Sequence, residues 1–249
     1  MNWERTKRSG GALSETAQRT LANLPLFAGL DAAELRSLEQ HARWRTYKAG
    51  ERVLESGSDS RDVFFMLSGS SSAVNYSFSG REVAFATFNA GEFFGELAAL
   101  DAQPRSASVV ATEESLIATV PGEVFLDLLR RRVEVTFKVF QHLAAMVRAS
   151  TVRIMELSTL AAAARVYSEL LRMAKPDAAV PGLWIVRPLP PLREIASHAS
   201  TTRETVTRAL SQLYPTGLMR RKGRNLFITD RARLEVLIQQ LQMTGGQKI

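Results

Sequence analysis

The chain changes character at Pro121-Gly122, and this boundary limits the folds that it can adopt. From Glu123 to Leu157 there is neither glycine nor proline, so nothing interrupts a helix. Apolar and small residues recur there at alternating intervals of three and four, the spacing of a helix that pairs with another helix along one seam. A helix packed on its own β-domain has the same pattern, so both arrangements stay open. The seam positions are Phe137, Phe140, Ala144, Val147, Thr151, Ile154 and Ser158.

Before that boundary, the chain has the pattern of short β-strands. Runs rich in Val, Phe, Leu and Thr alternate with glycines from Trp44 to Val120, at intervals of 7 to 12 residues. Short strands with regular turn signals are typical of an antiparallel sandwich or barrel. Residues 68–72 (Ser-Gly-Ser-Ser-Ser) are poor strand formers and predict a mobile segment or an exposed edge. A short helix capped by Asp31 is expected before the strands. The glycines are Gly50, Gly57, Gly69, Gly80 and Gly91.

The last part of the chain predicts two short helices joined by a tight turn. They cover residues 192–199 and 203–214, and the polar turn between them ends at Thr202, a good N-cap for the second helix. A hairpin with a basic tip at residues 220–225 follows. Helix, turn, helix and basic hairpin, in this order, form the winged helix-turn-helix pattern, whose second helix reads the major groove of DNA.

Charge is distributed unevenly along the chain, whose formal net charge is +7. Residues 160–249 contain 14 Lys and Arg against 6 Asp and Glu, a net charge of +8, whereas residues 1–159 have a net charge of −1. A near-neutral part joined to a basic part predicts two modules, the second of which faces a polyanion. Solvated surface arginines alone produce the same imbalance, so the assignment depends on the helix-turn-helix pattern.

A second chemical signal is the string GEFFGELAALDAQPRSASV, which starts at Gly91. It combines turn glycines with one carboxylate, Glu96, and one guanidinium nine positions later, Arg105. Backbone N–H groups and an arginine suit a phosphate, and a fixed carboxylate accepts a hydrogen bond from a sugar hydroxyl. Ser106 can donate a further hydrogen bond to the phosphate. A surface ion pair beside turn glycines is the plainer alternative, but the complete string favours a ligand site.

This string resembles the phosphate-binding cassette of cyclic-nucleotide-binding domains. The resemblance implies that Glu96 binds the ribose 2′-hydroxyl and that Arg105 binds the cyclic phosphate. It also implies that Gly95, Leu97 and Ser106 line the pocket.

Together with the seam helix and the terminal module, residues 24–238 resemble the cyclic-AMP receptor protein/FNR family of bacterial transcription regulators. In the cyclic-AMP-responsive branch of that family, a Thr-Ser pair on the long helix contacts the adenine. Ser150-Thr151 stands at that place with the order reversed, so both hydroxyls are kept.

The family resemblance implies an α+β fold. Its parts are an N-terminal β-roll (a double-stranded β-helix of the cyclic-nucleotide-binding type), a long dimerisation helix and a C-terminal winged helix-turn-helix. We expect a tail at residues 1–23, the β-roll at 24–122, the dimerisation helix at 123–159 and the DNA-binding domain at 160–249. The implied partners are a second copy of the chain, double-stranded DNA and RNA polymerase, which would touch the loop at residues 175–182.

The second helix of the winged module has a face that can read base pairs. Arg203 and Arg208 can each bond bidentately to guanine, and Glu204 can accept a hydrogen bond from cytosine N4. By resemblance these three match base-reading residues of the cyclic-AMP branch, so we expect a two-fold site with TGTGA-like half-sites. A dimer places its recognition helices about 34–36 Å apart, which sets the spacing of the half-sites. The predicted DNA-binding residues are Thr202, Arg203, Glu204, Thr207, Arg208, Arg221, Lys222 and Arg224.

Other classes of site and protein are disfavoured. The chain has no cysteine, which excludes disulfides, thiolate zinc sites and the iron–sulfur cluster of an FNR-type oxygen sensor. We expect His41, His142 and His198 to be surface or locally satisfied histidines, not haem or metal ligands. No catalytic constellation is visible, so we expect no enzyme. The chain lacks a secretory signal and an apolar run of about 18 residues, so we expect no membrane span and a cytoplasmic location.

The effector stays partly open. Cyclic AMP is expected, and cyclic GMP is the alternative because the hydroxyls of Ser106, Ser150 and Thr151 could serve either purine. Within the same family, the chain could instead bind another small molecule or act without a nucleotide. In a different class, it could be a ligand-binding interaction module without specific DNA binding.

Overall fold

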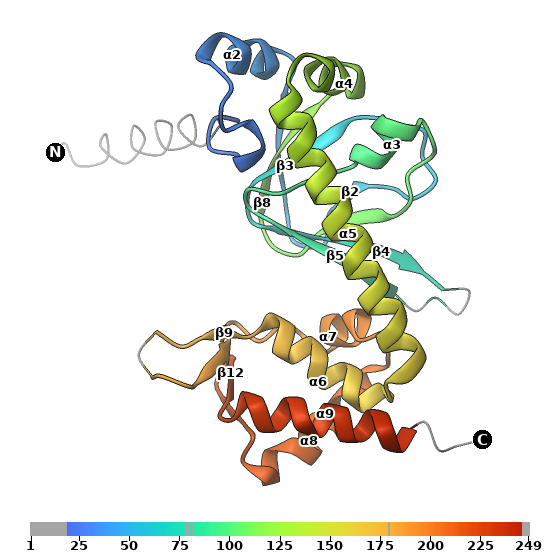
Figure 1. Cartoon of the computed structure of the whole chain (residues 1–249), viewed down its shortest axis with the longest axis vertical. Coiled ribbons are helices and arrows are strands. Elements are labelled where there is room, and N and C mark those ends of the chain that lie inside the picture. Colours follow the sequence, from blue (N-terminus) through green and yellow to red (C-terminus); the bar gives the residue numbers. More distant parts are fainter. Residues whose placement is uncertain (1–18, 78–79, 81, 179, 246–249) are drawn as a thin grey trace, which may run out of the picture. The chain divides into compact units, whose positions relative to one another are not determined.

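The computed structural model describes residues 19–77, 80, 82–178 and 180–245 (Figure 1). The chain divides into two compact units: the first holds the described residues up to Tyr76 and those from Ala84 to Ala145, and the second holds the others. The boundary therefore falls inside the segment predicted as the long helix. Residues 1–18 of the predicted tail lie outside the described residues. None of the described helices is both long and apolar enough to cross a membrane.

The first unit contains two four-stranded sheets, in the orders β1-β8-β3-β6 and β2-β7-β4-β5. The pairings β1·β8, β3·β8, β3·β6, β2·β7 and β4·β7 are antiparallel, as the regular glycine spacing predicts. The unit has two apolar clusters: one, with the fully buried Phe65, joins helices to strands, and the other, with the fully buried Ile117, joins strands of both sheets. The strands are β1 (Arg43–Tyr47), β2 (Arg52–Leu54), β3 (Val63–Ser68), β4 (Ser70–Tyr76), β5 (Glu82–Asn89), β6 (Phe93–Phe94), β7 (Ser108–Ala111) and β8 (Ser115–Val120).

The serine-rich segment at residues 68–72 is half-buried at its start and buried at Ser71 and Ser72, so the expectation of an exposed edge is wrong. Gly69 turns the chain between β3 and β4 with a φ of +81°, and a Cβ there would lie 2.3 Å from Ser115 Oγ. Ser71 is fully buried in β4, which lies between β7 and β5. The Ser115 hydroxyl donates to Ser70 O at 3.0 Å. Hydrogen bonds offset the burial of these serines, which strand propensity does not show.

Short helices complete the first unit. The predicted cap is confirmed, because the Asp31 carboxylate accepts hydrogen bonds from the backbone N–H groups of Ala33 and Glu34, and Glu34 closes a capping box. The helices are η1 (Pro25–Phe27), α2 (Ala32–Gln40), α3 (Glu96–Asp101) and α4 (Gly122–Arg131).

The segment predicted as one helix over residues 123–159 is two helices. After α4, Arg132 takes an extended conformation with φ −126° and ψ 92°, and a second helix follows. The guanidinium of Arg132 forms an ion pair with Glu34 of α2 and lies 3.9 Å from the Asp31 carboxylate. This ion pair with a distant part of the chain stabilises the interruption between the two helices. Helical propensity does not predict the interruption, because propensity depends on local sequence alone.

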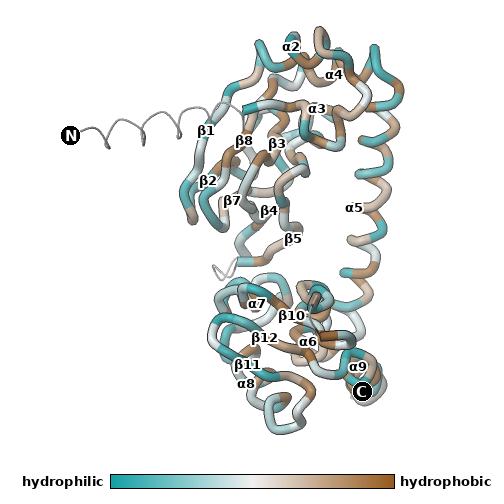
Figure 2. Tube along the Cα trace, turned by 90° about the vertical axis from the view of Figure 1, so that its left-hand side faces the viewer, coloured by the Kyte–Doolittle hydropathy of each residue, from teal (hydrophilic) through white to brown (hydrophobic). Residues whose placement is uncertain are grey.

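The second of these helices, α5 (Val133–Thr159), is 27 residues long and has two different faces. Val135 and Val139 are buried in the core of the first unit. The predicted seam lies on the other face, and four of its large apolar side chains are 57–66% exposed. Figure 2 shows apolar stretches that recur along α5 between hydrophilic ones. Thus α5 packs on its own domain and also presents an uncovered apolar seam. The four exposed side chains are Phe137, Phe140, Val147 and Ile154.

The second unit has the predicted winged helix-turn-helix. Helix α8 begins after Thr202, whose hydroxyl oxygen accepts a hydrogen bond from Thr205 N at 3.2 Å. Val206 and Leu210 hold α8 against the core, and the last helix, which we did not predict, adds Leu234. A sheet in the order β11-β12-β10-β9 supports the wing. The elements are α6 (Ala162–Met173), β9 (Lys175–Pro176), β10 (Trp184–Val186), α7 (Leu192–His198), α8 (Arg203–Leu213), η2 (Tyr214–Thr216), β11 (Met219–Lys222), β12 (Asn225–Ile228) and α9 (Arg231–Gly245).

Candidate functional site

Arg105 is the centre of the predicted nucleotide pocket, and its side chain is almost completely buried. The residue is only 4% exposed. Its guanidinium donates to Gly95 O and Asp62 O, each at 2.6 Å, and to Ser60 Oγ at 3.1 Å. Its charged carbon lies 5.6 Å from the centre of the Phe64 ring. These contacts fix the plane of the guanidinium and leave two of its five N–H groups for a ligand.

The contacts of Arg105 are all to neutral oxygens. No carboxylate oxygen of a described residue lies within 4 Å of the guanidinium, because the Asp62 carboxylate pairs with Arg43 at 2.6 Å and Glu96 acts on it from farther away. Burial lowers the pKa of Arg105, against the attraction of Asp62 and Glu96. Burying a charge is costly unless it is paired. The site is therefore prepared for an anion that brings its own negative charge.

The structure places the other cassette residues around this guanidinium. Gly95 has a φ of +84°, and a Cβ there would lie 2.7 Å from Arg105 Nη1, so only glycine fits without a shift. Glu96 is 2% exposed at the start of α3, and Leu97 is half-buried beside it. Ser106 is exposed, with its hydroxyl free to reach a ligand next to Arg105. The cassette therefore has the geometry of a phosphate site with a carboxylate beside it.

His142 belongs to this site, and our expectation of a surface or locally satisfied histidine was wrong for it. It projects from α5, and its Nε2 lies 3.7 Å from Glu96 Oε1. Its ring packs on Phe93, with ring centres 4.5 Å apart. The Nε2 atom is buried without a hydrogen-bond partner among the described residues. A lone histidine in a helix gives no sequence signal of this, because its partner Glu96 is 46 positions away.

Sequence reasoning also missed how Arg105 is held. Asp62 and Gly95 contribute backbone carbonyl oxygens, which leave no signature in the residue type. Ser60 contributes a hydroxyl from a loop that carries no motif.

Ser150 and Thr151, predicted to contact the base, belong to the second unit, whereas the cassette belongs to the first. Both are exposed on α5. The Thr151 hydroxyl donates to Val147 O of its own helix at 3.0 Å, a bond that it can exchange for one to a ligand. Their contact with the base stays a prediction.

The residues predicted to read DNA lie on the exposed face of α8. Thr202, Arg203, Glu204, Thr207 and Arg208 are exposed, while the opposite face is buried. The pKa of the Glu204 carboxyl is lowered by a hydrogen bond from its own backbone N–H and by the Thr202 hydroxyl, which keeps it an acceptor. None of these charged groups forms an ion pair with another residue in the described part of the chain, so they are available to a partner.

The wing adds a second group of free cations. Arg221, Lys222 and Arg224 are exposed around a turn in which Gly223 has a φ of +60°. The Arg221 guanidinium donates to Gly223 O at 3.2 Å and forms no ion pair with a described residue. Cations at such a tip suit the phosphates beside a recognition helix.

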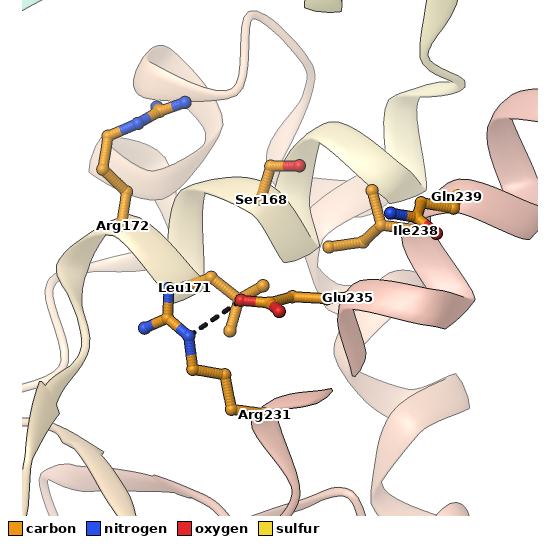
Figure 3. Close-up of a pocket in the computed structure, with 7 residues that line it drawn as sticks. All are labelled: Ser168, Leu171, Arg172, Arg231, Glu235, Ile238 and Gln239. Carbon is orange, nitrogen blue, oxygen red and sulfur yellow. Dashed lines mark hydrogen bonds and ion pairs between the residues drawn. The ribbon is translucent and has the colours of Figure 1, made fainter. Parts of the chain in front are cut away.

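A separate groove of about 390 Å³ lies in the second unit between α6 and α9 (Figure 3). Its arginines are already neutralised: Arg231 donates to Glu235 at 2.8 Å, and Arg172 pairs with Glu156 at 3.0 Å. It therefore offers no free charge to a ligand and is not the predicted pocket. The groove is lined by Ser168, Leu171, Arg172, Arg231, Glu235, Ile238 and Gln239.

Comparison with known proteins matches both units to protein families. Residues 44–132 match the cyclic nucleotide-binding domain, and residues 164–237 match the Crp-like helix-turn-helix domain. The Cyclic AMP receptor protein of Thermus thermophilus is 30% identical over 213 residues, which cover 85% of this chain and 95% of that protein. The chain belongs to the cyclic-AMP receptor protein/FNR family of transcription regulators. This membership confirms the predicted fold class and the expectation that the chain is not an enzyme.

Two other family members are similar to this chain over most of its length, one in sequence and one in structure. The cAMP-activated global transcriptional regulator Vfr of Pseudomonas aeruginosa is 29% identical over 201 residues, or 78% of this chain and 92% of that one. The solved structure of FixK2 from Bradyrhizobium japonicum superposes with a TM-score of 0.66 at 26% identity. It covers 79% of this chain and 96% of FixK2.

Proposed function

We propose that the chain is a dimeric transcription regulator whose affinity for DNA depends on a cyclic purine nucleotide, cyclic AMP in the first place. The observation that carries this proposal is the buried guanidinium of Arg105, which is held by neutral oxygens and has no carboxylate oxygen of a described residue within 4 Å. A singly charged cyclic phosphate supplies a counter-charge in direct contact and accepts two parallel hydrogen bonds. The names of the relatives from Thermus thermophilus and Pseudomonas aeruginosa support cyclic AMP.

The other pocket residues have complementary roles in this proposal. Glu96 accepts a hydrogen bond from the ribose 2′-hydroxyl, and Ser106 donates to the phosphate. The base reaches Ser150 or Thr151 on α5, which would connect the ligand to the seam of the dimer. Cyclic GMP is the alternative effector, because hydroxyl groups pair with donors and acceptors of either purine.

The exposed seam of α5 supports the dimer. Phe137, Phe140, Val147 and Ile154 would cover one another's apolar surface in a two-helix pairing. A two-fold dimer presents two copies of α8 to successive major grooves, so we propose a palindromic site with TGTGA-like half-sites. We also propose a cytoplasmic location and contact of RNA polymerase with the segment at residues 175–182, which begins with β9.

Calorimetric titration tests the nucleotide pocket. Cyclic AMP and cyclic GMP are titrated separately into the wild-type protein, the Arg105→Ala variant and the Arg131→Ala variant. Arg131 is a matched control because it is a largely exposed arginine of the same unit that pairs with Asp127, away from the contacts of Arg105. We expect Arg105→Ala to weaken binding at least about a hundredfold, since a hydrogen bond to a charged group is worth about 1.5–3 kcal/mol and two are lost. Binding heat that survives Arg105→Ala undiminished contradicts the phosphate role.

Fluorescence anisotropy with short duplexes tests the DNA-binding surface. Arg203→Ala should cost about 1–3 kcal/mol on a TGTGA-containing duplex and relax base preference, whereas Lys222→Ala should weaken binding to all duplexes and reduce the salt slope by about 1. Arg233→Ala, an exposed arginine of α9, is the control. Equal affinity of the wild type for TGTGA and random duplexes would favour an interaction module. Tight, specific binding that ignores nucleotide would favour a regulator without a nucleotide effector.

A further inference from the structure

The imidazole of His142 is placed by contacts on two sides. From α5 it packs on the Phe93 ring at 4.5 Å, and its Nε2 points toward Glu96 Oε1 at 3.7 Å. That nitrogen is buried and has no hydrogen-bond partner among the described residues. A buried polar atom without a partner costs free energy, and a movement of less than 1 Å would make the bond to Glu96. The pair is therefore poised to form a direct hydrogen bond.

Glu96 has room for two donors. A carboxylate has two oxygens and about four acceptor positions, so one oxygen can bind His142 while the other takes the ribose hydroxyl. Because Glu96 is 2% exposed, few waters can orient it. The direction in which its free oxygen points then depends on His142.

The charged groups around His142 favour its protonated form. Glu96 of α3 faces it, and Glu92, just before β6, attracts it from farther away. On α5 itself, the Lys138 ammonium is occupied by the carbonyl oxygens at residues 25, 26 and 28. The guanidinium of Arg105 acts on Glu96 but is held by Gly95 and residues 60–62. The pKa of His142 is accordingly raised, chiefly by its interaction with Glu96 and against the effect of burial.

We propose that His142 is a positioning residue for the nucleotide. Its Nε2 donates a hydrogen bond to one oxygen of Glu96, and this bond turns the other oxygen toward the ribose. Nucleotide binding is then tighter when the imidazole is protonated. This inference rests on the proposed function, since it assigns Glu96 to the ribose. It goes further by giving the site a proton as a second effector and by joining α5 to the cassette through residues of the first unit alone.

The direction in which nucleotide affinity changes with pH follows from the charges of His142, Glu96 and the ligand. Neutral His142 beside Glu96 leaves the pair with a charge of −1, whereas protonated His142 makes the pair neutral. An arriving cyclic phosphate is an anion, so it binds better to the neutral pair and raises the pKa of His142 further. Binding therefore takes up a proton, and affinity falls as pH rises through the titration of His142. A difference of one unit between the pKa of free and bound protein corresponds to about a tenfold change in affinity.

Titration calorimetry across pH tests the proposal. The dissociation constant of cyclic AMP is measured from about pH 6 to about pH 8.5 in pairs of buffers with different ionisation enthalpies, which also counts the protons taken up. The full-length wild type is compared with His142→Gln, His142→Leu and His41→Gln. Glutamine keeps a donor but does not titrate, leucine keeps volume only, and His41 is an exposed histidine of the same unit.

We expect the wild type and His41→Gln to bind more weakly by about fivefold to tenfold at the high end of this range, with proton uptake on binding. His142→Gln should bind with a flat pH profile and without proton uptake, and His142→Leu should bind more weakly at every pH. NMR titration of the imidazole in the wild type gives an independent reading, since the chain has only three histidines. Its pKa should rise when cyclic AMP is added.

Two contrary outcomes are distinct. Binding that requires Arg105 but has the same pH profile in the wild type and His142→Gln, with no change of the His142 titration on adding cyclic AMP, overturns the role of His142 and leaves the proposed function standing. Absence of cyclic-nucleotide binding at every pH overturns the proposed function and this inference together.

Discussion

At the scale of single residues, the pocket depends on a position that has no side chain. Gly95 has a φ of +84°, and a Cβ at this position would come within 2.7 Å of Arg105 Nη1 and 3.0 Å of Asp62 O. Gly50 has the same φ with no atom near the corresponding Cβ position. Alanine substitutions at the two glycines therefore distinguish the effect of backbone strain, which both share, from a steric effect on the pocket, which only Gly95 has.

Gly95→Ala and Gly50→Ala should both lose stability, by about 1 kcal/mol each, because alanine disfavours a positive φ. Only Gly95→Ala should also weaken cyclic-AMP binding, by about tenfold or more, since the guanidinium must move away from Gly95 O. Urea unfolding measures the first effect and calorimetry the second. Equal nucleotide affinity in the two variants would show that Arg105 does not need this close approach.

His198 is a second buried histidine, and its environment acts in the opposite direction to that of His142. Burial lowers its pKa, and Arg153 and Arg172 lower it further, against the attraction of Glu169. In the unfolded chain the imidazole takes up a proton below about pH 6.5, which the folded state resists. The free energy of unfolding should therefore fall as pH drops below that value.

The prediction for His198 is checked by thermal unfolding of the full chain between about pH 5 and pH 8. Relative to the wild type, His198→Gln should flatten the loss of stability on the acid side, while His41→Gln should leave it unchanged. Because each unit of pKa difference is worth about 1.4 kcal/mol, even a moderate shift is visible in the melting temperature. If the His198→Gln variant lost as much stability at low pH as the wild type, the buried imidazole would not be the cause of that loss.

At the scale of elements, α5 carries the clearest prediction. Its exposed seam includes Phe140 and Ile154, which are 57% and 63% exposed. Phe140→Glu should raise the dimer dissociation constant at least about thirtyfold, since it removes a large apolar contact and places a charge in the apolar seam. Ala149→Glu is the control, because residue 149 lies about 200° around the helix from Val147. Analytical ultracentrifugation distinguishes the two.

A Phe140→Glu protein that sediments like the wild type at every concentration would contradict the seam. An equal effect of Ala149→Glu would show instead that charge anywhere on α5 disturbs the helix. The expected result is a monomer in the first variant at concentrations where the control remains dimeric.

Sequence patterns predicted local elements well where local chemistry determines them. The cap at Asp31, the cap at Thr202 and the wing around Gly223 are all found, because each depends on neighbours a few residues away. The break at Arg132 was missed, since the ion pair with Glu34 joins segments 98 positions apart. The same limit applies to the buried serine segment, which depends on hydrogen bonds to Ser115.

The candidate site shows the same division. The spacing of Glu96 and Arg105 was informative because the cassette is continuous in sequence. The groups around Glu96 and Arg105 are not continuous with the cassette in sequence. Asp62 O and Ser60 Oγ come from a preceding loop, and His142 comes from a later helix. The motif therefore predicts which groups would touch a ligand, whereas the groups that surround Arg105 and Glu96 became visible only in three dimensions.

At the scale of the whole molecule, the split of charge has a functional meaning. The near-neutral part up to residue 159 contains the cassette, and the part from residue 160, with a net charge of +8, contains the recognition helix and wing. A ligand can change the affinity for DNA only if it binds two arrangements of the protein with different affinity. The coupling must then be reciprocal, because both ligands act on one equilibrium.

Reciprocity makes a quantitative prediction for the intact dimer. If saturating cyclic AMP tightens binding to a TGTGA duplex by a factor between about 5 and 150, the saturating duplex must tighten cyclic-AMP binding by the same factor. Anisotropy measures the first factor and calorimetry the second, at one salt concentration because phosphate contacts depend on salt. Arg105→Ala should abolish the nucleotide effect on DNA while it preserves binding of the duplex by the unliganded protein. If neither ligand changed the affinity for the other in the wild type, the two sites would not be coupled. The chain would then bind DNA and nucleotide independently.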